Sequence, residues 1–136
     1  MKKIIMLTAL AATISCGAMA QKMKADKVPQ AVRTAFAKAY PNVKDADWEK
    51  EDGDYEVGFE QGKEEYSVVF DAQGNLLETE KEIKTTELPA AVQAPLKGKK
   101  IKEVAVITRA GKTYYEAEVG GRDLLFDADG KPAKLN

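Results

Sequence analysis

Two stretches of the chain place apolar residues at helical spacing around a proline. In the first, apolar side chains recur every four residues, backed by small alanines, at Val28, Val32, Phe36 and Tyr40. Pro29 suits a first helical turn, where a missing N–H leaves nothing unpaired, and Pro41 ends the pattern. The second stretch has Leu88, Val92 and Leu96, but Pro95 interrupts it. The pattern predicts two helices, of which the second is the shorter.

After each helix, apolar and polar residues alternate with period two, which is typical of half-buried strands. The clearest runs are Tyr55–Glu60 and Tyr66–Phe70. Further strands are expected at Ala46–Lys50, Leu76–Glu80, Val104–Thr108 and Ala133–Leu135. Short loops that contain glycine join neighbouring runs, so antiparallel hairpins are expected. The parity assigns a set of aromatic residues to the helix-covered face: Tyr55, Phe59, Tyr66, Phe70, Tyr115 and Phe126. For Trp48 we expect partial burial.

The two halves of the chain repeat each other. The segment Val28-Pro29-Gln30-Ala31-Val32 returns as Leu88-Pro89-Ala90-Ala91-Val92, and Phe70-Asp71-Ala72-Gln73-Gly74 returns as Phe126-Asp127-Ala128-Asp129-Gly130. We therefore predict an α+β fold built as a tandem duplication, with repeats at residues 21–83 and 84–136. Each repeat packs a helix on a roughly four-stranded antiparallel sheet, with the helices on one face. Because one repeat is marginal by itself, the two either share a core or continue one sheet.

The N-terminus has the features of a secretory signal peptide. Lys2 and Lys3 precede an apolar run, and Ala18-Met19-Ala20 forms an A-x-A site, so residues 1–20 are expected to be cleaved after Ala20. The alternative is a lipoprotein anchored through Cys16, which we disfavour because Thr13 occupies a position where such sites usually have Leu. Cleavage would direct the mature protein to the periplasm.

The composition of the mature chain excludes most catalytic chemistry. The sequence has no His, its single Cys is removed with the signal peptide, and Ser67 is the one remaining Ser. Pairs of Ser or Cys with His, a histidine base and a histidine-ligated zinc are all excluded. We therefore expect no enzyme activity, no catalytic or metal-ligating residues and no cofactor.

Charge and hydropathy limit the partners. Loss of Lys2 and Lys3 leaves 19 basic and 22 acidic residues, a net charge of −3, with the lysines scattered among acids. Nucleic acid and anionic lipid need clustered positive charge, so neither is an expected partner. No later apolar run is long enough to span a membrane.

Carboxylates offer the one alternative chemistry. The acids between Asp45 and Glu56 are the densest group in the chain and would serve a carboxylate-dependent envelope enzyme or a cation-binding protein. Because Lys44 and Lys50 lie among them, we expect these acids to be splayed and solvated. The segment Asp127-Ala128-Asp129-Gly130 resembles part of a calcium loop but lacks the later acid, so we interpret it as a turn.

The repeated motifs resemble a family of exported proteins with a PepSY-like fold, described as similar to the beta-lactamase-inhibitory protein. The resemblance rests on both helix segments, on Trp48-Glu49-Lys50-Glu51-Asp52-Gly53 with Tyr55-Glu56-Val57, and on the segment from Phe70 to Glu80. It implies a tandem pair of helix-plus-sheet units exported to the periplasm of a Gram-negative cell.

The favoured interpretation is a non-catalytic periplasmic binding or inhibitor-like module that acts through an open sheet face on a periplasmic or envelope protein or peptide. The candidate contact residues have the parity opposite to the core: Tyr114, Glu116, Val69 and Leu125.

Overall fold

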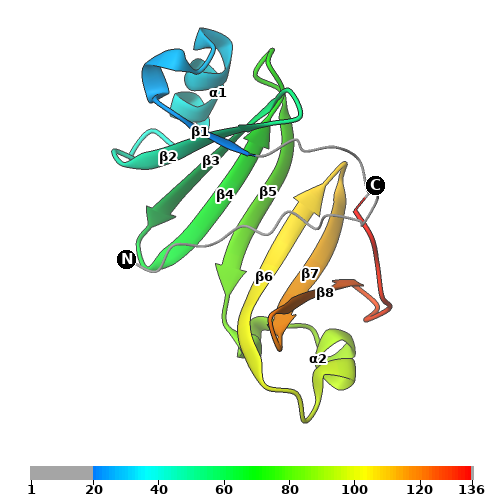
Figure 1. The fold of residues 1–136 in the computed structure, drawn as a ribbon. Coiled ribbons are helices and arrows are strands. Elements are labelled where there is room, and N and C mark those ends of the chain that lie inside the picture. Colours follow the sequence, from blue (N-terminus) through cyan, green and yellow to red (C-terminus); the bar gives the residue numbers. More distant parts are fainter. Residues whose placement is uncertain (1–19, 136) are drawn as a thin grey trace. The chain divides into compact units, whose positions relative to one another are not determined.

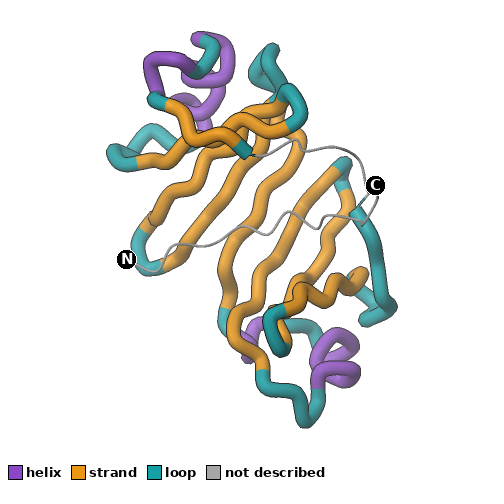
Figure 2. The backbone as a smooth tube through the Cα atoms, in the orientation of Figure 1, coloured by secondary structure: helices purple, strands orange, loops and turns teal. Residues whose placement is uncertain are grey.

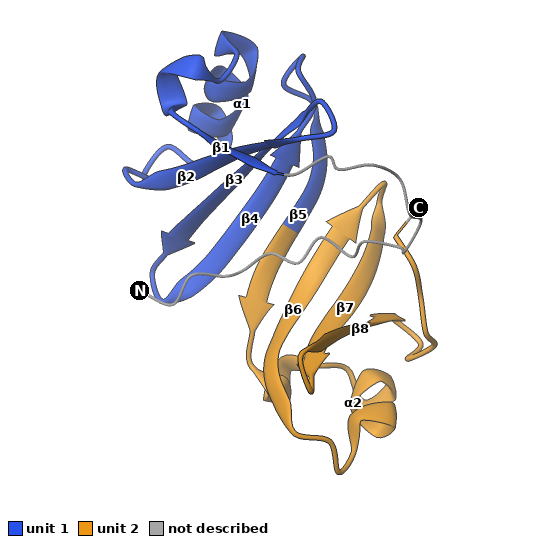
Figure 3. Ribbon diagram, in the orientation of Figure 1, with its two compact units in different colours: residues 1–4, 14–79 blue, residues 5–13, 80–136 orange. Residues whose placement is uncertain are grey.

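The computed structural model describes residues 20–135. The prediction of a signal peptide at residues 1–20, including the alternative lipid site at Cys16, thus lies almost wholly outside the described residues. The described chain divides into two compact units, residues 20–79 and 80–135 (Figure 3). Among the residues described, no helix is both long and apolar enough to cross a membrane.

Each unit combines one α-helix with a run of strands (Figures 1 and 2). The first unit contains β1 (Gln21–Met23), a 3-10 turn (Ala25–Lys27), α1 (Gln30–Ala39), β2 (Ala46–Glu51), β3 (Asp54–Gln61) and β4 (Glu64–Phe70). Strand β5 (Leu76–Ile83) leads into the second unit, which continues with a 3-10 turn (Thr85–Glu87), α2 (Ala90–Leu96), β6 (Ile101–Arg109), β7 (Lys112–Val119) and β8 (Arg122–Asp127).

The strands are hydrogen-bonded to one another in chain order, from β1 to β8, in one eight-stranded sheet. This confirms the α+β class and agrees with the alternative in which the repeats continue one sheet, while it corrects the expectation of a separate, roughly four-stranded sheet in each repeat. The difference arises partly at β5, which runs to Ile83 and so extends three residues past its expected end at Glu80.

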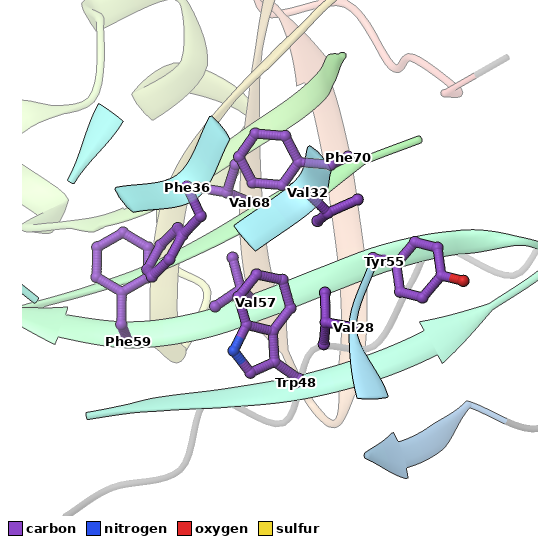
Figure 4. Close-up of a cluster of buried hydrophobic side chains, with 9 residues drawn as sticks. All are labelled: Val28, Val32, Phe36, Trp48, Tyr55, Val57, Phe59, Val68 and Phe70. Atoms are coloured by element: carbon purple, nitrogen blue, oxygen red, sulfur yellow. The ribbon is translucent and has the colours of Figure 1, made fainter. Parts of the chain in front are cut away.

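In the first unit, α1 lays its apolar stripe on the sheet and forms the core. Val32 and Phe36 from the helix pack against every second residue of the strands, that is, against the side chains on one face of the sheet. Val57, Val68 and Phe70 are among them (Figure 4). The Phe36 ring packs edge-on against Trp48, with centroids 5.3 Å apart. Trp48 is only 6% exposed, so the expectation of partial burial was wrong, because its parity on β2 points it beneath the helix.

In the second unit, the shorter helix repeats this arrangement. Leu88, Val92 and Leu96 pack against buried strand residues, including Val104, Ala117 and Phe126. Helix α2 has seven residues where α1 has ten, which confirms the predicted inequality. Pro95 lies within the last turn of α2, and the helix ends one residue later at Leu96, since proline removes a backbone donor.

The duplicated sequence motifs meet in space. In each unit the glycine of the Phe-Asp-Ala-x-Gly turn lies against the start of the helix: a methyl group added to Gly74 would lie 2.7 Å from the carbonyl oxygen of Ala31. Gly130 approaches the carbonyl of Ala91 in the same way. The repeated motifs are therefore the two sides of one helix–turn contact, which requires glycine because the backbones touch.

One predicted strand is absent and one strand was not predicted, both near the ends of the described residues. The residues from Ala133 to Leu135 form no strand; pairing near them is limited to an isolated bridge between Phe126 and Pro132 and one bond from the Ala133 N–H to the Leu125 carbonyl. Pro132 has no N–H with which to extend the ladder. Conversely, β1 was not predicted, because three residues are too few to show a period.

Candidate binding faces

The sheet segment of the first unit has a second face, opposite α1, and it is acidic. The positions that alternate with the core residues of β2, β3 and β4 are Asp47, Glu49, Glu51, Asp54, Glu56, Gly58, Glu60, Glu65, Ser67 and Val69. We call this set the acidic face. Seven of its members are carboxylates, and none is Lys or Arg. Lys50, on the opposite face, instead places its ammonium group 5.5 Å from the centre of the Tyr55 ring.

Two of these carboxylates lie directly opposite each other. Glu49 on β2 and Glu56 on β3 are cross-strand partners. Burial raises the pKa of Glu56 to about 7, and the negative charges of Glu49, Glu51 and Glu78 contribute to the rise. The expectation that the acids are splayed and fully solvated was therefore wrong for Glu56, although Asp45, Asp47 and Asp52 are exposed as expected.

The register of the hairpin brings the two glutamates together. Asp52 and Gly53 form a tight turn in which both residues have positive φ, 51° and 90°. This turn pairs Glu51 with Asp54, and the pairing then places Glu49 opposite Glu56. The Asp-Gly pair was therefore the sequence signal that could have predicted the contact, had the register been counted outward from it.

Ser67 lies on the same face, next to Glu56. Ser67 is 2% exposed. Among the described residues, no group lies at ordinary hydrogen-bond distance and angle from its hydroxyl oxygen. It is nevertheless close enough to the Glu56 carboxyl to lower the pKa of that group, a smaller effect than burial. Ser67 therefore belongs to the buried surroundings of the Glu56 carboxyl and not to the exposed surface of this face.

The second unit also has a face opposite its helix, which holds three of the four predicted contact residues. Tyr114 lies between Ile107 and Asp127, and in the next row Glu116 lies between Ala105 and Leu125. The three contact residues are half-buried, whereas Ile107 is 1% exposed. The fourth, Val69, belongs to the first unit, where it is half-buried opposite Glu56. Sequence reasoning overlooked Ile107, whose parity matches that of Tyr114.

A third row on this face is acidic. Glu103, Glu118 and Asp123 follow one another across β6, β7 and β8. Burial raises the pKa of Asp123, as do the charges of Glu118 and Glu103, while Lys102 lowers it. The Lys102 ammonium group lies 3.3 Å from a carboxylate oxygen of Glu118 and neutralises part of this row. Lys102 therefore compensates part of the negative charge of this row.

The two Asp-containing turns use their carboxylates internally. In the second unit, Asp127 Oδ1 accepts hydrogen bonds from the backbone N–H groups of Asp129, at 2.9 Å, and Lys131, at 3.0 Å. In the first unit, Asp71 is bonded in the same way, and bonds from Asn75 hold the pKa of Asp71 below its ordinary value. These bonds confirm the prediction of turn capping. Within residues 20–135, no group of three or more candidate metal ligands converges.

Comparisons with known proteins agree with this architecture. A family model described as "Putative beta-lactamase-inhibitor-like, PepSY-like" matches residues 16–78 and again residues 53–133, in keeping with a duplication. No curated protein matches the chain.

Three solved structures share the fold. A BLIP-like protein from Bacteroides fragilis is 28% identical, with a TM-score of 0.63 over 78% of this chain and 84% of its own. A DUF2874 family protein from Bacteroides uniformis is 21% identical, with a TM-score of 0.70 over 78% and 86%. A protein from Bacteroides eggerthii described as "putative periplasmic" is 18% identical, with a TM-score of 0.72 over 79% and 86%. The chain belongs to the PepSY-like, beta-lactamase-inhibitor-like family.

Proposed function

We propose that the mature protein is a non-catalytic binding or inhibitor-like module of the periplasm, which holds a protein or peptide partner against sheet faces that its helices leave free. The observation that carries the proposal is the set of cross-strand neighbours on the sheet face of the second unit opposite α2. Tyr114, Glu116 and Leu125 lie together on the face opposite α2, and all three are half-buried. Aromatic and aliphatic groups that keep partial exposure beside charged ones are typical of contact surfaces.

Other observations support the location and the absence of catalysis. The N-terminal sequence has the order of a signal peptide, and one structural neighbour carries a periplasmic description. The chain has no His, and Ser67 is buried away from solvent. Catalysis by a Ser–His or Cys–His pair or by a histidine base therefore has no residues on which to operate.

A second candidate, the carboxylate-dependent enzyme, is favoured by one observation. The pKa of Glu56 is raised to about 7, as in a general acid, and Glu49 is beside it as a second carboxylate. Incubation of the protein with cell-envelope glycans would test this alternative: release of soluble fragments by the wild type, and their loss in Glu56→Gln, would favour it over the binding module.

Affinity capture from a periplasmic extract tests the proposed function. The wild type is compared with Tyr114→Glu, which places a charge on the half-buried row, and with Thr113→Glu, which adds the same charge at an exposed neighbouring position of β7. We expect Tyr114→Glu to lose the captured partner and Thr113→Glu to retain it. Equal recovery by both variants would remove this face from the proposal.

A further inference from the structure

We propose that the outer edge of β8 binds an extended segment of a partner protein, which joins the second unit as a further antiparallel strand at Asp123 and Leu125. This inference rests on the proposed function and names the way in which a partner segment is held. It concerns the backbone of β8, and so it can be tested apart from the side chain of Tyr114 on β7.

Strand β8 has a neighbouring strand on one side only. It stands last in the strand order, next to β7. On its other side, the residues that follow it cover part of its edge. The Asp127 N–H donates a hydrogen bond to the Lys131 carbonyl at 2.9 Å, and the Leu125 carbonyl accepts one from the Ala133 N–H at 2.9 Å. Among residues 20–135, no backbone group pairs with this side of β8 before Leu125.

The backbone of Asp123 faces this open side. In an antiparallel ladder, the N–H and C=O groups of every second residue point to the same side of the strand. Leu125 and Asp127 bond on the side away from β7, so Asp123, two residues earlier, directs its N–H and C=O there as well. No described residue donates or accepts at these two groups. Unpaired strand edges of this kind are templates for an added strand.

The side chains of the C-terminal segment explain why it covers no more of the edge. If the segment continued along β8 past Ala133, Lys134 would lie opposite Leu124, which packs against the core. Leu135 would then lie opposite Asp123, on the other face. This alternation is the reverse of that of β8, so the ladder stops. Two backbone hydrogen bonds hold the segment to β8, and the edge at Asp123 is left open.

The first repeat shows how the equivalent edge is filled. The same turn follows β4, where the Asp71 N–H donates to the Asn75 carbonyl at 3.0 Å. The chain after that turn forms β5, which is hydrogen-bonded to β4. In the second repeat, Pro132 stands at the position of Leu76, the first residue of β5, and no strand follows. The position beside β8 is therefore one that this fold fills with a strand elsewhere in the same chain.

The side chains at the open edge define the partner segment. Leu124 lies on the core face and is only half-buried, so an apolar residue opposite it would complete its burial. Asp123 lies on the other face beside Glu118, and its carboxyl has no printed bond to Lys102, which pairs with Glu118. A lysine or arginine opposite Asp123 would form a favourable cross-strand pair. The expected segment alternates apolar with polar residues and carries a basic residue at one polar position.

A peptide titration tests the proposal on the intact mature protein. The probe is a short blocked peptide, Val-Thr-Val-Arg-Thr, whose central valine would lie opposite Leu124 and whose arginine would lie opposite Asp123. Two derivatives each carry one N-methyl group. Methylation at arginine removes the N–H that would donate to the Asp123 carbonyl, whereas methylation at the central valine alters an N–H that points away from β8. Calorimetry should show binding weakened about tenfold by the first and less than about twofold by the second.

Two proline substitutions in the C-terminal segment form a matched pair. Ala133→Pro removes the N–H that occupies the Leu125 carbonyl, so it should open more of the edge and tighten peptide binding several-fold. Lys134→Pro removes an N–H that makes no backbone bond among the described residues, and it should leave the Kd within about twofold. Neither position lies in a helix or strand, so both variants should fold.

A charge exchange tests the pairing at Asp123. Asp123→Lys should weaken binding of the arginine peptide about tenfold, and a peptide with glutamate in place of arginine should regain the lost affinity. Asp129→Lys makes the same change of charge at an exposed turn residue and should have neither effect. A general loss of structure in the Asp123→Lys variant would weaken both peptides, so recovery by the glutamate peptide identifies a direct pair.

Three results would overturn the proposal. The first is equal weakening by the two N-methyl derivatives, because binding would then not use the backbone of β8. The second is the absence of peptide binding to both the wild type and Ala133→Pro. The third is a dimer of Ala133→Pro in sedimentation, which would assign the edge to a second copy of this chain.

Affinity capture with Tyr114→Glu separates this proposal from the proposed function. If capture depends on Tyr114 but neither the wild type nor Ala133→Pro binds the peptide, only the strand addition is refuted. Peptide binding that depends on the arginine N–H, with capture that does not depend on Tyr114, refutes the sheet face as the contact and supports the edge of β8.

Discussion

Glu49 and Glu56 are direct cross-strand partners on β2 and β3, so two carboxylates occupy one row of the sheet. Neighbouring strands usually place opposite charges in such a pair, because like charges there repel each other. The protein tolerates the arrangement by holding Glu56 partly protonated near neutral pH, as its pKa of about 7 indicates. The pair is thus a source of instability when both carboxyls are ionised, although Lys22 on β1 lies on the other side of Glu49.

The first prediction concerns stability against pH. Glu56 has a pKa of about 7 in the folded state against an ordinary value of 4.5, so the folded protein binds more protons between these values than the unfolded chain. Stability should therefore fall as pH rises from 4.5 through 7. The groups that act on Glu56 are Glu49 and Glu51 from β2, Ser67 from β4 and Glu78 from β5. Glu56→Gln should reduce this dependence, leaving the contribution of Asp123, whose pKa is also raised, and should stabilise the protein at pH 8 by about 1 to 3 kcal/mol.

Chemical denaturation at a series of pH values measures this effect. Glu60→Gln is the control, since Glu60 lies on the same face of β3 but is exposed. It should leave the slope against pH unchanged. A wild-type stability that rises between pH 4.5 and 7, or a Glu56→Gln variant with the wild-type slope, would show that Glu56 is not held protonated.

The second prediction concerns the helix–turn contact that both repeats share. Gly74→Ala and Gly130→Ala should each destabilise the protein by about 3 kcal/mol or more, because each adds a methyl group against a helix carbonyl at a positive φ. Gly62→Ala is the matched control: its φ of 69° is also positive, but the space around it is open. It should cost about 1 kcal/mol. Thermal unfolding would contradict the account if all three variants lost the same stability.

The third prediction concerns the aspartates that begin the two turns. Asp127→Ala should cost about 1 kcal/mol, since the backbone N–H groups of Asp129 and Lys131 lose their acceptor. The loss should be the same with and without calcium, because the carboxylate serves the turn. A melting temperature of the wild type that rises with added Ca²⁺, and an Asp127→Ala variant that does not respond, would restore the calcium interpretation.

The fourth prediction concerns the mature N-terminus. Intact mass of the exported protein should correspond to a chain that begins at Gln21 and carries no lipid, because Ala18-Met19-Ala20 is a well-formed cleavage site. Metabolic labelling with a fatty acid is the complementary measurement. Label retained by the wild type and lost on Cys16→Ala would establish a lipoprotein instead.

Much of the fold was readable from periodicity. The four-residue spacing of Val28, Val32 and Phe36 predicted α1, and the position of Pro95 predicted a short α2, because both depend on local sequence. The alternation in β3 and β4 assigned the core aromatics correctly. Local patterns are reliable here because each element buries a single face.

The missed features all depend on pairing between segments. The burial of Trp48, the opposition of Glu49 and Glu56 and the length of β5 follow from strand register, which no single segment encodes. The burial of Ile107 is of the same kind, since it depends on the row that Ile107 shares with Tyr114. The charged sequence from Asp45 to Glu56 suggested that all of its acids are exposed to solvent. Glu56 is an exception, because it lies on β3 between its partners on β2 and β4.

Site-specific photo-crosslinking tests the central claim, that a protein partner contacts the sheet faces opposite the helices. A photoreactive amino acid is placed at Val69 and, separately, at Leu125, with exposed helix positions Ala37 on α1 and Ala94 on α2 as controls. Irradiation in periplasmic extract should give the same partner adduct from Val69 or Leu125 and none from the helix positions. Adducts formed equally well from Ala37 or Ala94, or from the helix positions alone, would contradict the claim.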